Sequence, residues 1–340
     1  MKRSLAKPAA GATAVLLLTL TAAACSSSSS SSTATGGSTA TGGSTSGKSY
    51  KMTFIQGVAG DGFYVTMGCG IQAEAKKLGN VTTNTQGPSK FDATLQNPII
   101  ESVTAAKPDA ILVAPNDVSA SRPPIAAAMA AGIKVVLVDT TLSDPSGAVS
   151  QISSDNPAGG GFAFKAIQQL VPNGGEVLVV STTPGVSTTD QRTQGFADAA
   201  KADPKFKYLG VQYDQDSASV AAQVTLASLQ KNPNIVGIFA TNLFSAEGAA
   251  TGVRQAGKSG KVKIVGFDAD PDQITALKQG TVQALVAQHP YDIGTNAVDQ
   301  AYAALTGKQT DPKIGTKFTI ITQANLNSAD SQAAIYKTAC

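Results

Sequence analysis

From Tyr50 onward the sequence alternates short apolar runs with helical stretches, and this alternation most strongly limits the fold. Tyr64, Met67, Ile71, Ala75 and Leu78, for example, fall on one face of a helix. Further helical stretches lie near residues 91–107, 121–131, 157–171, 190–202, 217–231, 245–257 and 271–279. The apolar runs are continuous, as in parallel strands buried on both faces; they are Met52–Val58, Ala110–Ala114, Val135–Val138, Val177–Val180, Ile235–Ala240 and Ile264–Phe267. This repetition predicts an α/β fold of open, doubly wound parallel sheets.

The strand and helix segments fall into two sets. The first set runs to about Thr140 and the second begins near Gly175. Candidate connections lie at Ser150–Asn156, near Gln288–Pro290 and near Lys313–Lys317. A body of about 290 residues is long enough for two lobes of ordinary size.

Residues 1–24 have the pattern of a secretory signal that precedes a lipid-modified cysteine. Three basic residues come first, the short apolar run Ala12–Leu20 follows, and small residues stand directly before Cys25. The apolar run is too short to span a bilayer, which takes about 20 residues. The pattern resembles a bacterial lipoprotein signal, with Cys25 as the lipidation site, and the alternative is ordinary secretion with an incidental cysteine. Residues 25–49 are almost wholly Ser, Thr, Gly and Ala, which predicts an unstructured tether.

Charge and residue counts exclude several classes of function. Of the 26 basic residues, Lys2, Arg3 and Lys7 belong to the leader, which leaves 23 against 23 acidic residues. A neutral body argues against nucleic acid as a partner. The only histidine, His289, forms neither a histidine metal cluster nor a Ser-His-Asp triad. We therefore expect no enzyme, no metal and no cofactor.

Hydrogen-bonding and aromatic side chains follow the carboxyl ends of the expected strands, where ligands bind in open α/β sheets. They are Asp61, Phe63, Tyr64, Asp139, Thr140, Arg192, Gln215, Asn242, Asp268 and Gln288. Carboxylates, amides and a guanidinium suit the hydroxyls of a sugar or polyol, and aromatic faces suit its C–H faces. Each residue also has a plainer interpretation, since Asp and Asn often cap the next helix and the two aromatics would fit a core.

Several segments together resemble the periplasmic sugar-binding proteins of ABC importers, most closely the ribose-binding type. The resemblance covers about residues 50–323. It is carried by GDGFYVTMGCGIQAEAKKLG (60–79), DAILVAPND (109–117), GIKVVLVDT (132–140), SSDNPAGG (153–160), TTDQRTQGF (188–196), IFATN (238–242), VGFDADPD (265–272) and AQHPYDIG (287–294).

The resemblance implies roles for the strand-end residues. Phe63 and Tyr64 match the aromatic pair that sandwiches the sugar ring, and Asp139 and Arg192 match a sugar-binding acid and arginine. The remaining polar matches are Asn242, Asp268 and Gln288.

Three positions depart from the family pattern. Asp61 stands where an asparagine is frequent, Thr140 where an arginine is common, and Gln215 where the second lobe supplies an aromatic. These departures argue against ribose itself and are compatible with another pentose, a hexose or a polyol.

The resemblance also implies an organisation and a function. Residues 50–154 plus 289–317 would form the N-lobe and residues 155–288 plus 318–340 the C-lobe, with a three-segment hinge that closes over the ligand. We expect a monomeric, lipid-anchored solute-binding protein on the outer face of the cytoplasmic membrane or in the periplasm. It would deliver a monosaccharide or polyol to an ABC permease. The alternative is a sensor of a sugar or furanosyl signal that feeds a chemotaxis or signalling receptor.

Cys69 and Cys340 remain after Cys25 is assigned to the anchor. Disulfides persist in exported chains. The two residues would either form a bridge between the C-terminus and the first helix or remain two unpaired thiols.

Overall fold

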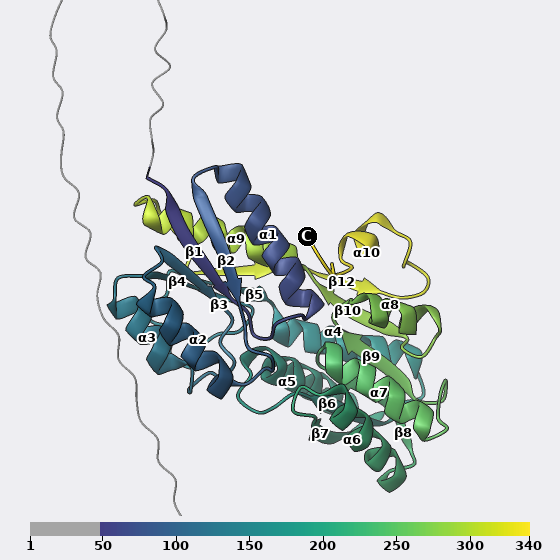
Figure 1. Cartoon of the computed structure of the whole chain (residues 1–340). Helices are drawn as coiled ribbons and strands as arrows, with labels where there is room; N and C mark the ends of the chain where they lie inside the picture. The colour runs from purple at the N-terminus through teal and green to yellow at the C-terminus, as the bar shows by residue number, and fades with distance from the viewer. Residues whose placement is uncertain (1–47) are drawn as a thin grey trace, which may run out of the picture. The chain divides into compact units, whose positions relative to one another are not determined.

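The computed structural model describes residues 48–340, which form two α/β lobes (Figure 1). The expected signal peptide, Cys25 and the tether up to residue 47 lie outside the described residues. None of the helices in residues 48–340 is both long and apolar enough to cross a membrane.

The first lobe is built on a six-stranded sheet in the order β11-β5-β4-β3-β1-β2, with every neighbouring pair parallel. Its strands are β1 (Tyr50–Ile55), β2 (Val81–Gln86), β3 (Ala110–Val113), β4 (Lys134–Val138), β5 (Ser150–Ser154) and β11 (Lys313–Thr316). Helices α1 (Gly62–Leu78) and α9 (Pro290–Leu305) pack on one face, and α2 (Ala93–Ala105) and α3 (Arg122–Ala130) pack on the other.

The second lobe repeats this plan with the order β12-β10-β9-β8-β6-β7. Its strands are β6 (Gly175–Ser181), β7 (Phe206–Tyr213), β8 (Ile235–Ala240), β9 (Lys263–Phe267), β10 (Ala284–Gln288) and β12 (Phe318–Ile321). Helices α4 (Asn156–Leu170) and α5 (Ser187–Ala202) cover one face, while α6 (Ala218–Lys231), α7 (Leu243–Gln255) and α8 (Pro271–Lys278) cover the other. The short helix α10 (Ala329–Ala333) follows β12.

The predicted fold class is confirmed, with two differences in detail. The edge strand β12 runs antiparallel to β10, so the second sheet is not wholly parallel. Strand β2 carries the mostly polar sequence VTTNTQ and was not expected as a strand, because an edge strand needs little apolar surface.

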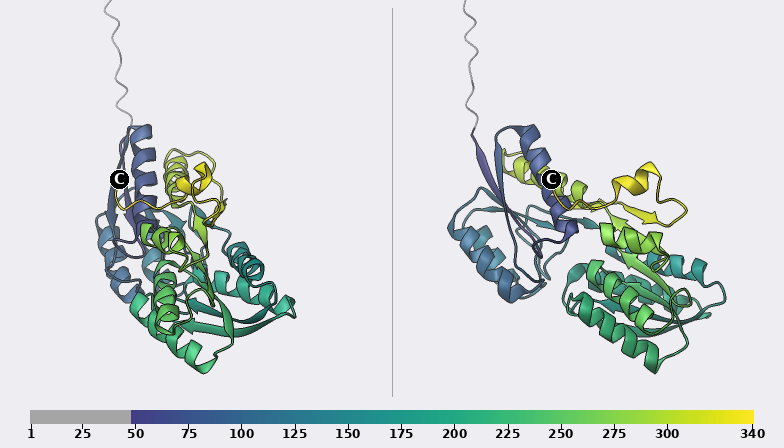
Figure 2. Two further views of the ribbon diagram at one scale, coloured as in Figure 1. Left: turned by 90° about the vertical axis from the view of Figure 1, so that its right-hand side faces the viewer. Right: turned by 45° about the vertical axis from the view of Figure 1, so that its right-hand side comes forward.

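The chain passes between the two sheets at three places. It crosses from β5 to α4, from β10 to α9 and from β11 to β12. Figure 2 shows the two lobes side by side with these crossings between them. Beyond α10 the chain returns to α1, where Cys340 and Cys69 form a disulfide with Cα atoms 5.3 Å apart.

Close contacts at glycines bring helices together in both lobes. A Cβ at Gly160 of α4 would lie 2.0 Å from the Arg192 carbonyl oxygen of α5, and one at Gly195 would lie 2.1 Å from the Pro157 carbonyl oxygen. Helices α1 and α9 meet in the same reciprocal way through Gly70 and Gly294. These backbone contacts leave no room for a side chain.

Candidate ligand-binding site

A cavity lies where residues from both lobes converge. The cavity is lined by Asp61, Phe63, Tyr64, Phe91, Asp139, Thr182, Val186, Thr188, Thr189, Arg192, Asp216, Asn242, Asp268 and Gln288. Eight of the ten ligand-contact residues expected from the sequence are therefore brought together.

Two cavity acids occupy equivalent positions in the two lobes. Asp139 follows β4 directly and Asp268 follows β9 directly, and both have a left-handed backbone, with φ of 61° and 78°. Their amides are held by the next strand, because Asp139 N donates to Ile152 O and Asp268 N donates to Val286 O. A non-glycine residue with such a φ is strained and persists where its surroundings hold it, commonly at functional sites.

Asp139 is paired with an aromatic residue of the cavity. The hydroxyl of Tyr64 donates to Asp139 Oδ2 at 2.8 Å, and both side chains are buried. Burial raises the pKa of Asp139 to about 6, although the charge of Arg192 and the bond from Tyr64 both lower it. Burial and the nearby Asp139 carboxylate raise the pKa of Tyr64 well above its ordinary value, so its hydroxyl stays protonated as a donor.

Asp268 accepts three hydrogen bonds within the protein. Its Oδ1 accepts from Gln288 Nε2 at 2.7 Å and from the Tyr336 hydroxyl at 2.8 Å, and its Oδ2 accepts from the Leu243 amide at 3.1 Å. Tyr336 does not line the cavity and was not expected at the site. A carboxylate has about four acceptor positions, so Asp268 retains capacity for a ligand hydroxyl.

Arg192 is held rigidly beside these acids. Its Nε donates to Asn156 Oδ1 at 2.8 Å, one terminal nitrogen donates to Thr241 O at 2.9 Å, and its guanidinium lies 3.8 Å from the ring centre of Phe267. The side chain is 3% exposed and is already ordered before a ligand binds. Binding therefore loses little of its conformational entropy. A guanidinium carries five N–H donors, and these two bonds use only two of them. The remaining N–H groups are held in place to donate to a ligand.

The aromatic pair Phe63 and Tyr64 lies in the core and also lines the cavity. The two rings meet edge to face with ring centres 5.1 Å apart. Phe91 adds a third ring that the sequence pattern did not indicate. Their apolar faces are suited to the C–H faces of a sugar ring.

Asp61 and Asn242 act as helix caps and line the cavity as well. Asp61 Oδ1 accepts from Phe63 N at the start of α1, and Asn242 Oδ1 accepts from Ser245 N at the start of α7. Burial, followed by repulsion from Asp268, raises the pKa of Asp61 well above its ordinary value. Capping thus uses one oxygen of each side chain. Asp61 keeps its second oxygen for a further contact, whereas Asn242 Nδ2 donates to Asp216 Oδ1.

Two expected contact residues do not line the cavity. Thr140 is buried and lines a separate small cavity, and its hydroxyl has no hydrogen-bond partner within residues 48–340. Gln215 faces a wide adjoining groove, while its neighbour Asp216 lines the cavity and accepts from Asn242 Nδ2 at 2.6 Å. Burial raises the pKa of Asp216 to about 6. Both residues 215 and 216 have positive φ, and this turn decides which side chain points inward.

The lining has an unbalanced charge. It contains four carboxyl groups, at Asp61, Asp139, Asp216 and Asp268, against the single guanidinium of Arg192. Carboxylates accept hydrogen bonds from hydroxyls but repel anions at short range. The arrangement therefore favours a neutral, hydroxyl-rich ligand over a sugar acid or sugar phosphate.

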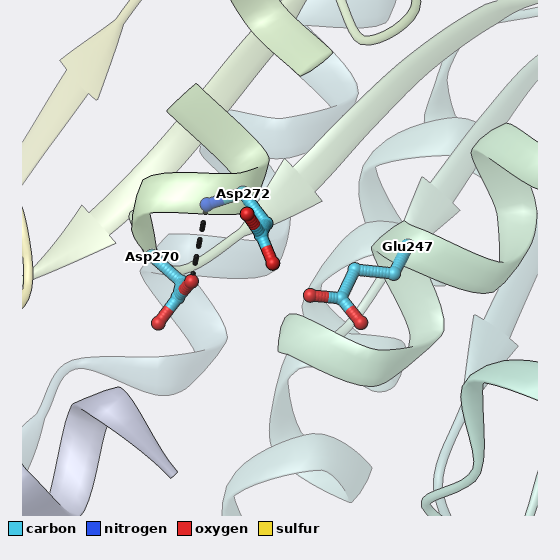
Figure 3. A group of neighbouring side chains, drawn as sticks. All are labelled: Glu247, Asp270 and Asp272. Atoms are coloured by element: carbon cyan, nitrogen blue, oxygen red, sulfur yellow. Dashed lines mark hydrogen bonds between the residues drawn. The ribbon is translucent and has the colours of Figure 1, made fainter. Parts of the chain in front are cut away.

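A second acidic group lies outside the cavity. Carboxylate oxygens of Glu247, Asp270 and Asp272 lie within 4.8 Å of one another (Figure 3). Asp270 is the N-cap of α8 and accepts from the Asp272 amide at 3.1 Å, which accounts for the position of both. Burial, and then repulsion from Asp270, raises the pKa of Glu247 to about 7.

Comparison with known proteins identifies the family. A profile described as a periplasmic binding protein domain matches residues 52–309. The chain belongs to the periplasmic binding protein family. The ribose import binding protein of Bacillus subtilis is 30% identical over 261 residues, which are 77% of this chain and 83% of that protein. The D-allose-binding periplasmic protein of Escherichia coli is 33% identical over 244 residues, 69% of this chain and 78% of that protein.

Solved structures agree with this assignment. An ABC transporter solute-binding protein from Agrobacterium vitis, bound with α-D-tagatopyranose, has a TM-score of 0.83 and 38% identity over 85% of this chain and 99% of that one. A second such protein from Agrobacterium vitis, with bound D-fucose, has a TM-score of 0.80 and 30% identity over 84% of this chain and 100% of that one. The expected resemblance to ribose-type periplasmic binding proteins is confirmed, and these relatives are transport binding proteins rather than enzymes.

Proposed function

We propose that this periplasmic binding protein captures a neutral monosaccharide or polyol between its lobes for an ABC importer. The cavity carries this proposal, because the carboxylates of Asp139 and Asp268, the guanidinium of Arg192 and the rings of Phe63 and Tyr64 all line it. Such a lining accepts from hydroxyls, donates to ring or hydroxyl oxygens, and covers apolar C–H faces.

The proposed ligand contacts are the cavity-lining residues among those expected from the sequence, together with Asp216 and Phe91. Thr140 and Gln215 are left out because neither lines the cavity. Four of the polar contacts are buried, namely Asp139, Arg192, Asp268 and Gln288. A ligand that lacks a matching hydroxyl would leave a buried donor or acceptor without a partner. That penalty, about 1–3 kcal/mol for each group, is the source of selectivity.

The lobes are proposed to close on the ligand by a hinge. Residues 50–154 plus 289–317 would move against residues 155–288 plus 318–340, with the three crossings as the hinge. Closure of this kind uses a few residues at the ends of secondary-structure elements. The closed form would then dock on the permease as a monomer.

A thermal-shift screen tests the ligand proposal directly. The panel should contain ribose, allose, tagatose, fucose and arabinose with related hexoses and polyols, and each active D-sugar should be paired with its L-enantiomer. A ligand at about 100 times its Kd adds roughly 2.7 kcal/mol to the stability of the folded state, which raises the midpoint by several degrees. Calorimetry then measures Kd. The proposal fails if no neutral sugar shifts the midpoint more than its enantiomer does and no polyol raises the midpoint.

The anchor is proposed to hold the binding protein at the outer face of the cytoplasmic membrane. The support is the leader sequence, in which small residues stand directly before Cys25. Mass spectrometry of the N-terminal peptide should detect a lipid on Cys25, and Cys25→Ser should release the protein into the soluble fraction. An unmodified Cys25 in membrane-associated protein would contradict this part of the proposal.

A further inference from the structure

The last seven residues of the chain, 334–340, contact both lobes, and we call this segment the C-terminal strap. It leaves the second lobe after α10 and ends beside α1 of the first lobe (Figures 1 and 2). On the second lobe, the Tyr336 amide donates to Ala269 O at 3.0 Å. On the first lobe, the Lys337 amide donates to Thr66 Oγ1 at 2.7 Å, and Cys340 is joined to Cys69. The strap is therefore a link between the lobes in addition to the three crossings.

Tyr336 places the strap against two residues of the cavity wall. Its hydroxyl donates to Asp268 Oδ1 at 2.8 Å, and its ring lies 5.8 Å from the ring of Phe63, edge to face. The side chain is only 3% exposed. Burial and the nearby Asp268 carboxylate raise the pKa of Tyr336 well above its ordinary value, so the hydroxyl remains a donor.

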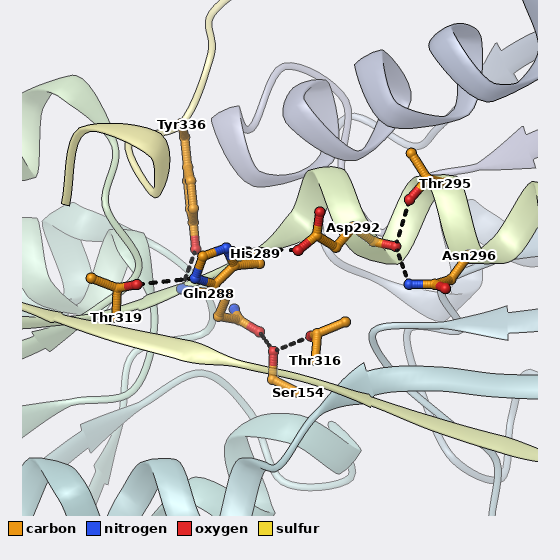
Figure 4. A network of polar contacts seen from close by, with 9 residues as sticks. All are labelled: Ser154, Gln288, His289, Asp292, Thr295, Asn296, Thr316, Thr319 and Tyr336. Carbon is orange, nitrogen blue, oxygen red and sulfur yellow. Dashed lines mark hydrogen bonds and ion pairs between the residues drawn. The ribbon is translucent and has the colours of Figure 1, made fainter. Parts of the chain in front are cut away.

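The same hydroxyl also connects to the hinge. The Tyr336 hydroxyl accepts from the backbone amide of Gln288 at 3.3 Å, at the point where β10 leads into α9. The Gln288 side chain donates to Asp268 through Nε2 and accepts from the Ser154 hydroxyl through Oε1, and Ser154 contacts Thr316 at 3.2 Å. Figure 4 shows Tyr336 bonded to Gln288, Gln288 bonded to Ser154, and Ser154 in turn in contact with Thr316. One hydrogen-bonded network thus joins Tyr336 and Asp268 to all three hinge crossings.

The two strand-end acids are each held by a buried tyrosine, but the tyrosines come from different parts of the chain. Tyr64, which holds Asp139, is itself part of the cavity wall. Tyr336, which donates to Asp268, lies outside the wall and belongs to the strap, between the bond of its own amide to Ala269 and the attachment of Cys340 to Cys69. The strap therefore adds one hydrogen bond to the two that Gln288 and Leu243 donate to Asp268.

We propose that the C-terminal strap is an interlobe tie whose Tyr336 positions Asp268 for the ligand and whose attachment at Cys69 limits separation of the lobes. Tyr336 is a positioning residue, since it acts through Asp268. The effect on ligand affinity rests on the function proposed above, whereas the effects on Asp268 and on lobe separation do not.

Tyr336→Phe tests the positioning role, because it keeps the ring and removes only the hydroxyl. Loss of one hydrogen bond to a charged group should weaken sugar binding by about tenfold. The Leu243 amide, which donates to the other oxygen of Asp268 and does not touch the strap, should exchange its hydrogen faster in ligand-free protein. Tyr302→Phe is the matched control, since Tyr302 packs edge to face on Tyr50 and lies outside the cavity lining.

The double variant Cys69→Ser/Cys340→Ser tests the tie without leaving a free thiol. Small-angle scattering of ligand-free protein should give a larger radius of gyration than for the wild type, and calorimetry should give a weaker sugar affinity. The proposal is overturned if Leu243 exchange is unchanged in Tyr336→Phe, or if the radius of gyration is unchanged in the double variant. If the wild type binds no sugar, the proposed function fails, and exchange and scattering still decide the role of the strap.

Discussion

Two neighbouring glycines at the start of α4 should respond oppositely to the same substitution. A Cβ at Gly160 would lie 2.0 Å from the Arg192 carbonyl oxygen and 2.7 Å from the Phe196 amide nitrogen. Both are backbone atoms, so α4 and α5 must separate by more than about 1 Å to make room in a close-packed interior. A Cβ at Gly161 has no atom of another residue within 4 Å.

The expected magnitudes follow from these contacts. Replacing a helical glycine by alanine stabilises the folded state by about 0.5–1 kcal/mol when the site has room. This gain applies to both positions and cancels when the two variants are compared. Overpacking costs about 1–3 kcal/mol, so Gly160→Ala should be less stable than Gly161→Ala by that amount, and Gly161→Ala should be slightly more stable than the wild type.

Urea titration of both variants and the wild type measures these differences from the unfolding midpoints. Calorimetry adds an independent readout, because separation of α4 from α5 moves the backbone of Arg192 and should weaken sugar binding by about tenfold or more. Gly161→Ala should keep the affinity of the wild type. The reasoning is refuted if the two variants agree in stability to within about 0.5 kcal/mol, since the helices would then have absorbed the methyl group.

Three further predictions concern the cavity and the first lobe. Gly70→Ala should be less stable than Gly68→Ala by about 1–3 kcal/mol in urea titration. The reason is that a Cβ at Gly70 would lie 2.1 Å from the Tyr291 carbonyl oxygen, whereas one at Gly68 meets nothing within 4 Å. Equal stability of the two variants would contradict the close contact of α1 with α9. Arg192→Ala should abolish sugar binding. It should also lower the free energy of unfolding by about 1–3 kcal/mol, because Asn156 and Thr241 lose their buried donor. An unchanged sugar affinity in calorimetry would show that Arg192 does not contact the ligand. Burial raises the pKa of Asp139 from its ordinary 3.8 to about 6, so its contribution to the stability of the ligand-free protein is present below about pH 4 and is lost as the pH rises through 6. The stability of the wild type relative to Asp139→Asn should thus fall by up to about 3 kcal/mol between pH 4 and pH 7, and parallel pH profiles of the two proteins would contradict it.

The sequence predicted those features that a local pattern encodes. Continuous apolar runs indicate buried parallel strands, and polar residues at their carboxyl ends indicate where a ligand would bind. Asp139 and Asp268 were expected at the site for this reason, and both line the cavity. The mostly polar strand β2 escaped the same reasoning because an edge strand pairs through its backbone and buries few side chains.

Features set by turns and distant contacts were not predictable in this way. Asp216, rather than Gln215, lines the cavity. Both residues have positive φ, and the turn that they form directs the side chain of Asp216 inward. Phe91 lines it because the loop before α2 passes the cavity, whereas the sequence pattern placed this residue at the start of a helical stretch.

The sequence by itself thus determined the α/β class, the division into two sets of elements and most of the polar residues of the site. Only the tertiary structure decided how those residues are held. Tyr336 bonds to an acid 68 positions earlier in the chain, and it does so where the strap passes between the second lobe and α1. Local periodicity reports which residues are buried, whereas the partner of a buried polar group depends on how separate elements pack, which a pattern along the chain does not contain.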